Sequence, residues 1–263
     1  MSAGFVSLPF DGRQVDIEHV WINEELADAP TMVFLHEGLG SVSMWRDFPK
    51  RVCDRLRIRG LVYSRPGYGR SSPRPDDERW LPDYQRRQAL ELLPALLEAL
   101  DVQRPWMLGH SDGASIALMY AARHDCGGLI VLAPHIMVED ISVKSIAEAR
   151  DAYLNTDLRE RLGRHHDSPD SAFWGWNHAW LNPDFRSWNI SEDITTITCP
   201  LLAVQGLDDE YGTLDQIRGI ARRLPQTELL EIPDCRHSPH KDQPQVLLDA
   251  CDDFYQQHQH AHT

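Results

Sequence analysis

The residues that could carry chemistry start with a serine between two glycines, in the pentapeptide GHSDG at 109–113. An apolar strand segment at 106–108 precedes the pentapeptide, and a helical sequence from Ala114 follows it. In this context the backbone turns sharply, so that the Ser111 hydroxyl stands above a sheet and near the N-terminal amides of a helix. The pattern predicts that Ser111 is a nucleophile.

A serine hydroxyl needs a neighbouring base, and an imidazole with an ordinary pKa near 6.5 suits that task. His237 lies between the last predicted strand and the last predicted helix, and we interpret it as the base. His240 is the competing candidate, although a capping or surface role explains it better. His110 is expected to pack on the other side of the turn, despite its position next to the serine.

An imidazole base also needs a carboxylate that fixes its tautomer and stabilises its charged form. The loop after the apolar segment 201–205 contains Asp208 and Asp209. Loops at the carboxyl ends of parallel strands are where catalytic groups collect in α/β sheets. Successive side chains diverge in such a segment, so only one of the two aspartates can face His237.

These residues need a scaffold in which strands and helices alternate. Predicted strands cover 4–9, 13–22, 31–35, 60–63, 105–108, 128–132, 201–205 and 228–232, and predicted helices cover 44–56, 83–100, 111–123, 214–224 and 243–257. The first two strands flank an Asp-Gly dipeptide, which favours a hairpin. Continuous apolar strands between helices indicate an α/β fold, with a mostly parallel sheet and helices on both faces.

One interval interrupts the alternation, because 136–199 is far longer than an ordinary crossover. We interpret it as an inserted helical cap, with 1–135 and 200–263 forming the core domain. Phe173, Trp176 and Trp180 fall on one helical face of this segment. That face either packs the cap onto the core or forms an aromatic wall of a substrate pocket.

Two further loops carry a resemblance. HEGLG at 36–40 follows one predicted strand, and RPGYGRS at 65–71 follows the next. Together with the chain order of Ser111, Asp209 and His237, they resemble the α/β-hydrolase superfamily, in its serine-nucleophile branch with a helical cap. The resemblance covers most of the chain and implies an eight-stranded type of sheet.

The same resemblance implies roles for individual residues. Asp209 lies three positions past the glycine that ends its strand, which selects it as the acid. The backbone N–H groups of Asp112 and Gly38 are expected to form the oxyanion hole. Glu37 stands where glycine is commoner, so the second donor is either Gly38 or Glu37.

Two acidic residues beside the nucleophile have alternative interpretations. Asp112 occupies the first turn of a helix, where the dipole stabilises a carboxylate by about 0.3 to 1 kcal/mol. Alternatively, Asp112 and Glu37 together make the pocket favour a cationic substrate group. The predicted pocket therefore includes Glu37, Trp176 and Trp180.

Composition excludes several function classes. The 263 residues carry a formal net charge of −14, which opposes binding to nucleic acid or to an anionic membrane. Five scattered cysteines without a CxxC pair fit a reduced, cytoplasmic location and predict no metal site. We find neither a signal-peptide pattern nor an apolar run long enough to span a membrane. The oligomeric state is left open.

The sequence therefore predicts a cofactor-free serine hydrolase that cleaves an ester-type bond of a small molecule through an acyl-enzyme intermediate. Hydrolysis of a carbon–carbon bond or of a lactone uses the same residues and remains an alternative. A noncatalytic ligand-binding receptor of the same fold is the alternative from another class.

Overall fold

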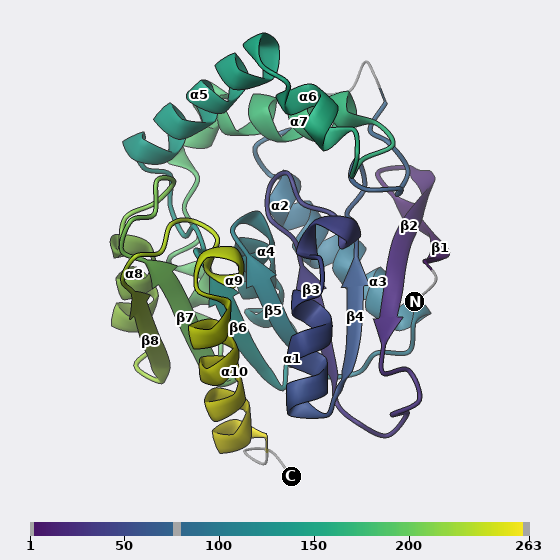
Figure 1. Cartoon of the computed structure of the whole chain (residues 1–263), viewed down its shortest axis with the longest axis vertical. Coiled ribbons are helices and arrows are strands. Elements are labelled where there is room, and N and C mark those ends of the chain that lie inside the picture. Colours follow the sequence, from purple (N-terminus) through teal and green to yellow (C-terminus); the bar gives the residue numbers. More distant parts are fainter. Residues whose placement is uncertain (1–2, 76–79, 260–263) are drawn as a thin grey trace.

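The computed structural model describes residues 3–75 and 80–259, and in them eight strands form one sheet (Figure 1). The spatial order is β1-β2-β4-β3-β5-β6-β7-β8. The strands are β1 (Gly4–Phe10), β2 (Arg13–Ile22), β3 (Thr31–Leu35), β4 (Arg59–Tyr63), β5 (Trp106–His110), β6 (Gly128–Leu132), β7 (Leu201–Gly206) and β8 (Thr227–Ile232). The pairs β1–β2 and β2–β4 are antiparallel and the others are parallel. The predicted mostly parallel sheet is confirmed.

The antiparallel start follows from its turn residues. Asp11 and Gly12 connect β1 to β2, with φ angles of 59° and 73°. Positive φ at both central residues matches the twist of a tight hairpin, and Asp-Gly tolerates it. Phe10 therefore pairs with Arg13, as the dipeptide predicts.

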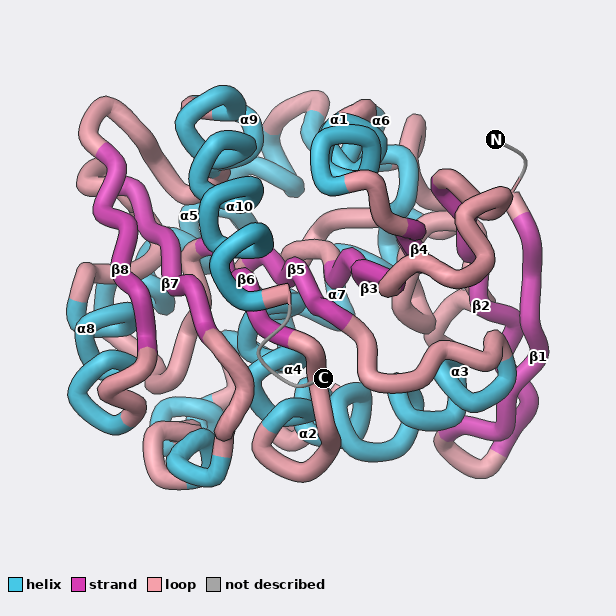
Figure 2. The backbone as a smooth tube through the Cα atoms, turned by 90° about the horizontal axis from the view of Figure 1, so that it is seen from below, coloured by secondary structure: helices cyan, strands magenta, loops and turns pink. Residues whose placement is uncertain are grey.

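Helices cover both faces of the sheet (Figure 2). One face buries apolar side chains of α1 (Phe48–Leu56) and α10 (Pro244–His258). The other face packs against α3 (Leu93–Ala99), α4 (Asp112–Ala121) and α8 (Asp215–Arg223). Shorter elements are η1 (Val42–Trp45), α2 (Tyr84–Arg87), η2 (Gln88–Leu92) and α9 (Pro239–Asp242). Among the helices described, we find none that is long and apolar enough to cross a bilayer.

The predicted helix over 83–100 is interrupted in its middle. It consists of α2, a wide π-helical turn at η2, and α3. Pro94 has no N–H, and its ring crowds the carbonyl four residues earlier, so the regular α-helical pattern cannot pass through it. The wider turn just before Pro94 relieves this conflict.

The segment 136–199 is mainly helical; its helices up to residue 180 lie over the carboxyl ends of the parallel strands (Figure 1), whereas residues 190–199 return along the sheet face that α4 and α8 cover. Its elements are α5 (Asp140–Asn155), α6 (Leu158–Leu162), α7 (Pro169–Trp180), η3 (Pro183–Ser187) and η4 (Asp193–Thr196). The segment has an aromatic cluster of its own, in which the rings of Tyr153 and Phe173 stack with centroids 3.7 Å apart. The division into two domains at 135 and 200 stays a prediction.

Candidate active site

Ser111 occupies the sharp turn between β5 and α4. Its backbone has φ of 53° and ψ of −118°, a conformation that is strained by about 1 to 3 kcal/mol for a residue with a side chain. The Ser111 N–H donates to the Leu132 carbonyl over 2.9 Å, which ties the turn to β6. A Cβ atom at Gly113 would collide with the Leu35 carbonyl, so the helix approaches β3 only because glycine stands there. The local sequence thus forces the serine above the sheet.

His237 lies between Ser111 and Asp209. Its Nε2 atom is 2.9 Å from Ser111 Oγ, and its Nδ1 atom is 2.8 Å from Asp209 Oδ1. Its backbone is held at both ends, because the N–H donates to Glu210 Oε2 over 3.2 Å and the carbonyl accepts from His110 Nε2 over 2.7 Å. The structure therefore brings together the three residues that the sequence selected.

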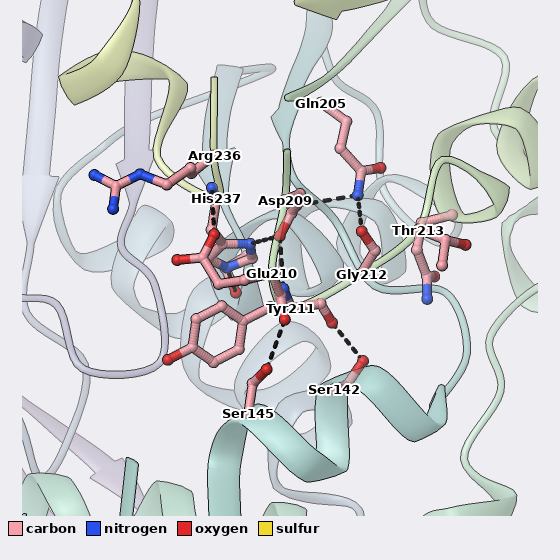
Figure 3. Close-up of polar contacts among 12 residues, drawn as sticks. Ser142, Ser145, Gln205, Asp209, Glu210, Tyr211, Gly212, Thr213, Arg236 and His237 are labelled. Carbon is pink, nitrogen blue, oxygen red and sulfur yellow. Dashed lines mark hydrogen bonds and ion pairs between the residues drawn. The ribbon is translucent and has the colours of Figure 1, made fainter. Parts of the chain in front are cut away.

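The two neighbouring aspartates differ as the sequence requires. Asp209 is buried, and its carboxylate accepts hydrogen bonds from Gln205 Nε2 over 3.0 Å and from the Tyr211 N–H over 2.8 Å (Figure 3). Asp208 is exposed to solvent. Only Asp209 faces His237, and its second oxygen is held by Gln205.

The carboxylate and the imidazole shift each other's pKa. Burial alone would raise the pKa of Asp209, but the charge of His237 and its hydrogen bond hold that pKa below its ordinary value. Burial alone would lower the pKa of His237, but Asp209 outweighs this and the pKa lies above its usual range. The pair is therefore suited to stabilise an imidazolium after proton transfer.

The loop that carries Asp209 is also held by α5, which lies below it in the view of Figure 3. Ser142 Oγ donates to the Tyr211 carbonyl, and Ser145 Oγ donates to the Glu210 carbonyl, each over 2.6 Å. These bonds connect the acid loop directly to the segment that covers the strand ends.

The loop after β3 presents one peptide group in a fixed orientation. The Glu37 carbonyl accepts from His36 Nδ1 over 2.7 Å and from Arg65 Nη2 over 2.7 Å. In a planar trans peptide the N–H points opposite to the carbonyl, so these two donors direct the Gly38 N–H away from Arg65. Neither the Gly38 N–H nor the Asp112 N–H donates to another described residue. The Glu37 N–H has no acceptor among the described residues either, so the choice between Gly38 and Glu37 as the second oxyanion donor stays a prediction.

Trp176 explains why residue 38 is glycine. A Cβ atom there would overlap the indole nitrogen of Trp176, so the α7 indole rests directly on the loop. Trp176 and Trp180 are buried, and both line the same cavity as Ser111. They pack the helical segment and also form walls of the cavity, so the two interpretations of the aromatic face are compatible.

Asp112 is buried beneath this wall and is surrounded by partners. Its carboxylate accepts from Tyr84 Oη and from Trp180 Nε1, and it lies 3.9 Å from Arg65 Nη1. Burial raises the pKa of Asp112, and the nearby Arg65 opposes that shift. Since both of its oxygens face protein groups, this arrangement favours a structural role over contact with a cationic substrate.

Glu37 is the acidic group that reaches the cavity beside this loop. Its carboxylate lies 3.6 Å from His110 Nδ1 and 3.6 Å from Lys241 Nζ. Burial would raise the pKa of Glu37, but His110 and Lys241 hold it well below its ordinary value. The cavity therefore carries a negative charge at this point.

The cavity around Ser111 has a volume of about 180 Å³. Its walls include Ile146 and Tyr211 in addition to the two tryptophans, and its polar groups include His135 and His237. A larger hollow of about 440 Å³ lies between Arg104 and Cys199, and it contains none of the predicted site residues. The smaller cavity is therefore the one where the predicted chemistry converges.

Two histidine predictions need correction. His110 packs as expected, but on the same side as His237, whose carbonyl it holds. His240 lies in α9 and is buried against Trp45 and Phe48. The predicted surface role for His240 is therefore wrong. The helix α9, which the sequence did not predict, carries His240 inward.

Sequence reasoning also missed His135 and the roles of Arg65 and Tyr84. His135 follows the carboxyl end of β6 and lines the cavity, so the rule that led to Asp209 could have found it. Arg65 lies in a recognised loop motif. However, its contacts with Glu37 and Asp112 join segments that are distant in sequence, and no local pattern reveals them.

Comparison with known proteins agrees with this architecture. A model of the alpha/beta hydrolase family matches residues 32–250, and the chain belongs to that family. Among curated proteins, the putative carbamate hydrolase RutD of Caulobacter sp. (strain K31) is 26% identical over 228 residues, covering 75% of this chain and 80% of that protein. The non-heme chloroperoxidase CPO-A1 of Kitasatospora aureofaciens is 26% identical over 230 residues, covering 75% of this chain and 81% of that protein.

Solved structures share the fold at low sequence identity. The enol-lactonase from Burkholderia xenovorans LB400 superposes with a TM-score of 0.74 at 19% identity, covering 95% of this chain and 100% of that chain. A thermophilic esterase from Thermogutta terrifontis superposes with a TM-score of 0.74 at 17% identity, covering 98% and 99%. These similarities define an α/β-hydrolase fold and leave the substrate to be argued from the site.

Proposed function

We propose that this protein is a serine hydrolase that cleaves an ester-type bond of a small molecule, with Ser111 as nucleophile, His237 as base and Asp209 as the orienting acid. The observation that carries the proposal is the continuous contact from Ser111 Oγ through the His237 ring to Asp209. Family membership supports hydrolysis, and the cavity beside Ser111 supports a small substrate.

In the first half of the proposed reaction, His237 Nε2 takes the proton of the Ser111 hydroxyl while Oγ attacks the carbonyl carbon. The Asp209 carboxylate keeps the proton on Nδ1 and stabilises the imidazolium. The N–H groups of Gly38 and Asp112 hold the oxyanion, and one such donor is worth about 2.7 to 4 kcal/mol in the transition state. The carbon–oxygen bond to the leaving group then breaks, and His237 returns its proton to the departing oxygen.

The second half repeats these steps with water. His237 takes a proton from a water molecule, whose oxygen attacks the acyl carbon. The bond between that carbon and Ser111 Oγ breaks, and the proton passes from His237 back to Oγ. The acid is released, and the free enzyme is restored without any change in oxidation state.

A fluorophosphonate probe tests the nucleophile. It is expected to label the wild-type protein and to leave Ser111→Ala unlabelled. Ser187→Ala is the matched control and should be labelled like the wild type, because this serine is exposed and does not line the cavity. Absence of labelling in a folded wild-type sample would contradict the proposal and favour a receptor of the same fold.

A substrate panel then tests the bond type. Short acyl esters, lactones and diketones are offered to the wild-type protein, and release of acid is followed in each case. We expect esters to be turned over fastest. Faster cleavage of a diketone or of a lactone would move the assignment to the corresponding alternative, which uses the same three residues.

A further inference from the structure

His135 is a buried imidazole that the proposed mechanism does not use. It is 3% exposed and lines the cavity that contains Ser111. Its ring centroid lies 5.9 Å from that of His237 and 5.0 Å from that of the Trp180 indole. It therefore stands beside the proposed reaction centre without belonging to the chain of contacts from Ser111 to Asp209.

The backbone of His135 is fixed, whereas its side chain is unpaired. Ser115 Oγ donates to its carbonyl over 2.7 Å and accepts from its N–H over 3.1 Å. Neither ring nitrogen has a hydrogen-bond partner within the described part of the chain; Nδ1 is sealed from the cavity, whereas Nε2 is accessible and is the nitrogen that a ligand can reach. A buried polar group left unpaired costs about 1 to 3 kcal/mol, so a rigidly held, unpaired imidazole in a cavity wall indicates a group that pairs with a ligand.

The imidazole of His135 is neutral at ordinary pH. Burial lowers its pKa to about 3, and the positive charge that His237 can carry lowers it in the same direction. A neutral imidazole offers one N–H donor and one acceptor nitrogen. Its natural partner is a hydroxyl or carbonyl oxygen rather than an ionised group.

The rest of the cavity restricts the ligand further. Its described lining residues include Glu37 and Glu210 but no lysine or arginine, so the cavity wall offers no permanent cation to hold an anionic substrate. Trp176, Trp180 and Ile146 supply flat or apolar surface. A cavity of roughly 150 Å³ can hold benzene, so about 180 Å³ suits a short chain or a single ring.

We propose that the substrate is a small uncharged ester that carries a further hydroxyl or oxo group, and that this oxygen binds the His135 imidazole while Ser111 attacks the ester carbonyl. This inference rests on the proposed function and narrows it to a substrate class. His135 would then determine specificity rather than take part in the chemistry.

The test uses two matched pairs of neutral esters. The first pair is methyl butanoate and its β-hydroxy derivative, and the second is butyl acetate and its hydroxybutyl analogue. For the wild-type protein we expect kcat/KM to be at least about tenfold higher for the hydroxylated member of one pair, because a site built around an oxygen discriminates against its absence. The pair that responds identifies the half of the substrate that contacts His135.

Variants of His135 then assign the preference. The quantity compared is the ratio of kcat/KM for the hydroxylated ester to kcat/KM for the plain ester. His135→Phe keeps an aromatic ring of similar size but has no nitrogen, so this ratio is expected to fall to about one. His135→Asn and His135→Gln each place an amide near one of the two ring nitrogen positions, and one of them is expected to recover part of the ratio. The ratio is measured within each variant, so a general loss of activity cancels.

His124→Phe is the matched control, since His124 is an exposed histidine that lies outside the cavity. A wild-type ratio near one in both pairs, or an unchanged ratio in His135→Phe, would overturn the inference while ester turnover leaves the proposed function standing. Absence of both ester turnover and fluorophosphonate labelling would overturn the proposed function, and the inference with it.

Discussion

Two pairs of a basic and an acidic side chain lie on opposite sides of Ser111, and the two pairs differ in their chemistry. On the base side, His237 and Asp209 are joined by a single hydrogen bond of 2.8 Å. On the oxyanion side, Arg65 and Asp112 are both buried, with 3.9 Å between their nearest charged atoms. Each side thus combines a basic group with a carboxylate, but the basic group is an imidazole on one side and a guanidinium on the other.

This difference matches the work that each side is proposed to do. His237 must gain and lose a proton in every cycle, and Asp209 stabilises the charged form. The oxyanion donors must keep one geometry throughout, because preorganised dipoles stabilise a transition state without reorganising. An arginine, which stays protonated in proteins, is suited to hold the Glu37 carbonyl permanently. An imidazole–carboxylate pair and a guanidinium–carboxylate pair therefore lie on opposite sides of one nucleophile.

The largest expected effect separates the two neighbouring aspartates. Asp209→Asn should lower kcat by roughly 10⁴-fold, since the imidazole loses the carboxylate that fixes its tautomer. Asp208→Asn is the matched control, and it should keep most activity and change the free energy of unfolding by no more than about 0.5 kcal/mol. Single-turnover kinetics and thermal melting measure both. A larger loss in the Asp208 variant would move the acid to that residue.

The second largest effect is expected from a change of Arg65, which holds the loop of the proposed oxyanion donor. Arg65→Lys keeps the charge but loses the planar fork that reaches both His36 and the Glu37 carbonyl. We expect kcat to fall by about 10- to 100-fold with little change in KM, which is less than the loss of a whole oxyanion donor. Arg70→Lys, in the same loop but exposed, serves as the control. A change in KM alone would mean that Arg65 does not orient the oxyanion donor.

A third variant tests the burial of Asp112. Tyr84→Phe removes a hydroxyl that donates to this carboxylate and should lower the free energy of unfolding by about 1 to 3 kcal/mol. Tyr120→Phe, also buried but on the far part of α4, should change it much less. Urea denaturation measures both variants. Equal stability of the two would show that the Asp112 carboxylate does not depend on Tyr84.

The smallest expected effect concerns pH. Activity requires neutral His237, so kcat/KM should rise with pH through an inflection above the ordinary histidine pKa, since Asp209 outweighs burial there. Glu210 also raises this pKa, and Glu210→Gln should move the inflection to lower pH by less than about 0.7 unit, because an exposed pair contributes about 1 kcal/mol or less. Arg65→Lys should leave the inflection in place. A shifted inflection pH in Arg65→Lys, or a higher inflection pH in Glu210→Gln, would contradict the assignment of proton transfer to the His237 side alone.

The sequence alone predicted the elements that meet at Ser111. The GHSDG turn needs only local features, namely glycine where Leu35 approaches and a helix that starts at the next residue. The strands from Thr31–Leu35 to Leu201–Gly206 follow from short, continuous apolar runs, which is the pattern of parallel strands that are covered on both faces. Parallel strands place their following loops at one edge of the sheet, which narrowed the acid to Asp208 or Asp209, and the family resemblance then selected Asp209.

Tertiary structure alone decided which buried groups are satisfied by protein partners. Asp112 and His135 are both buried beside Ser111, yet Asp112 meets Arg65, Tyr84 and Trp180, whereas no residue in 3–75 or 80–259 forms a hydrogen bond with the His135 ring. The partners of Asp112 come from three segments that are far apart in sequence. A side chain's role here depends on which distant donors reach it through space. Local periodicity and spacing contain no information about those contacts, and the folded chain supplies it.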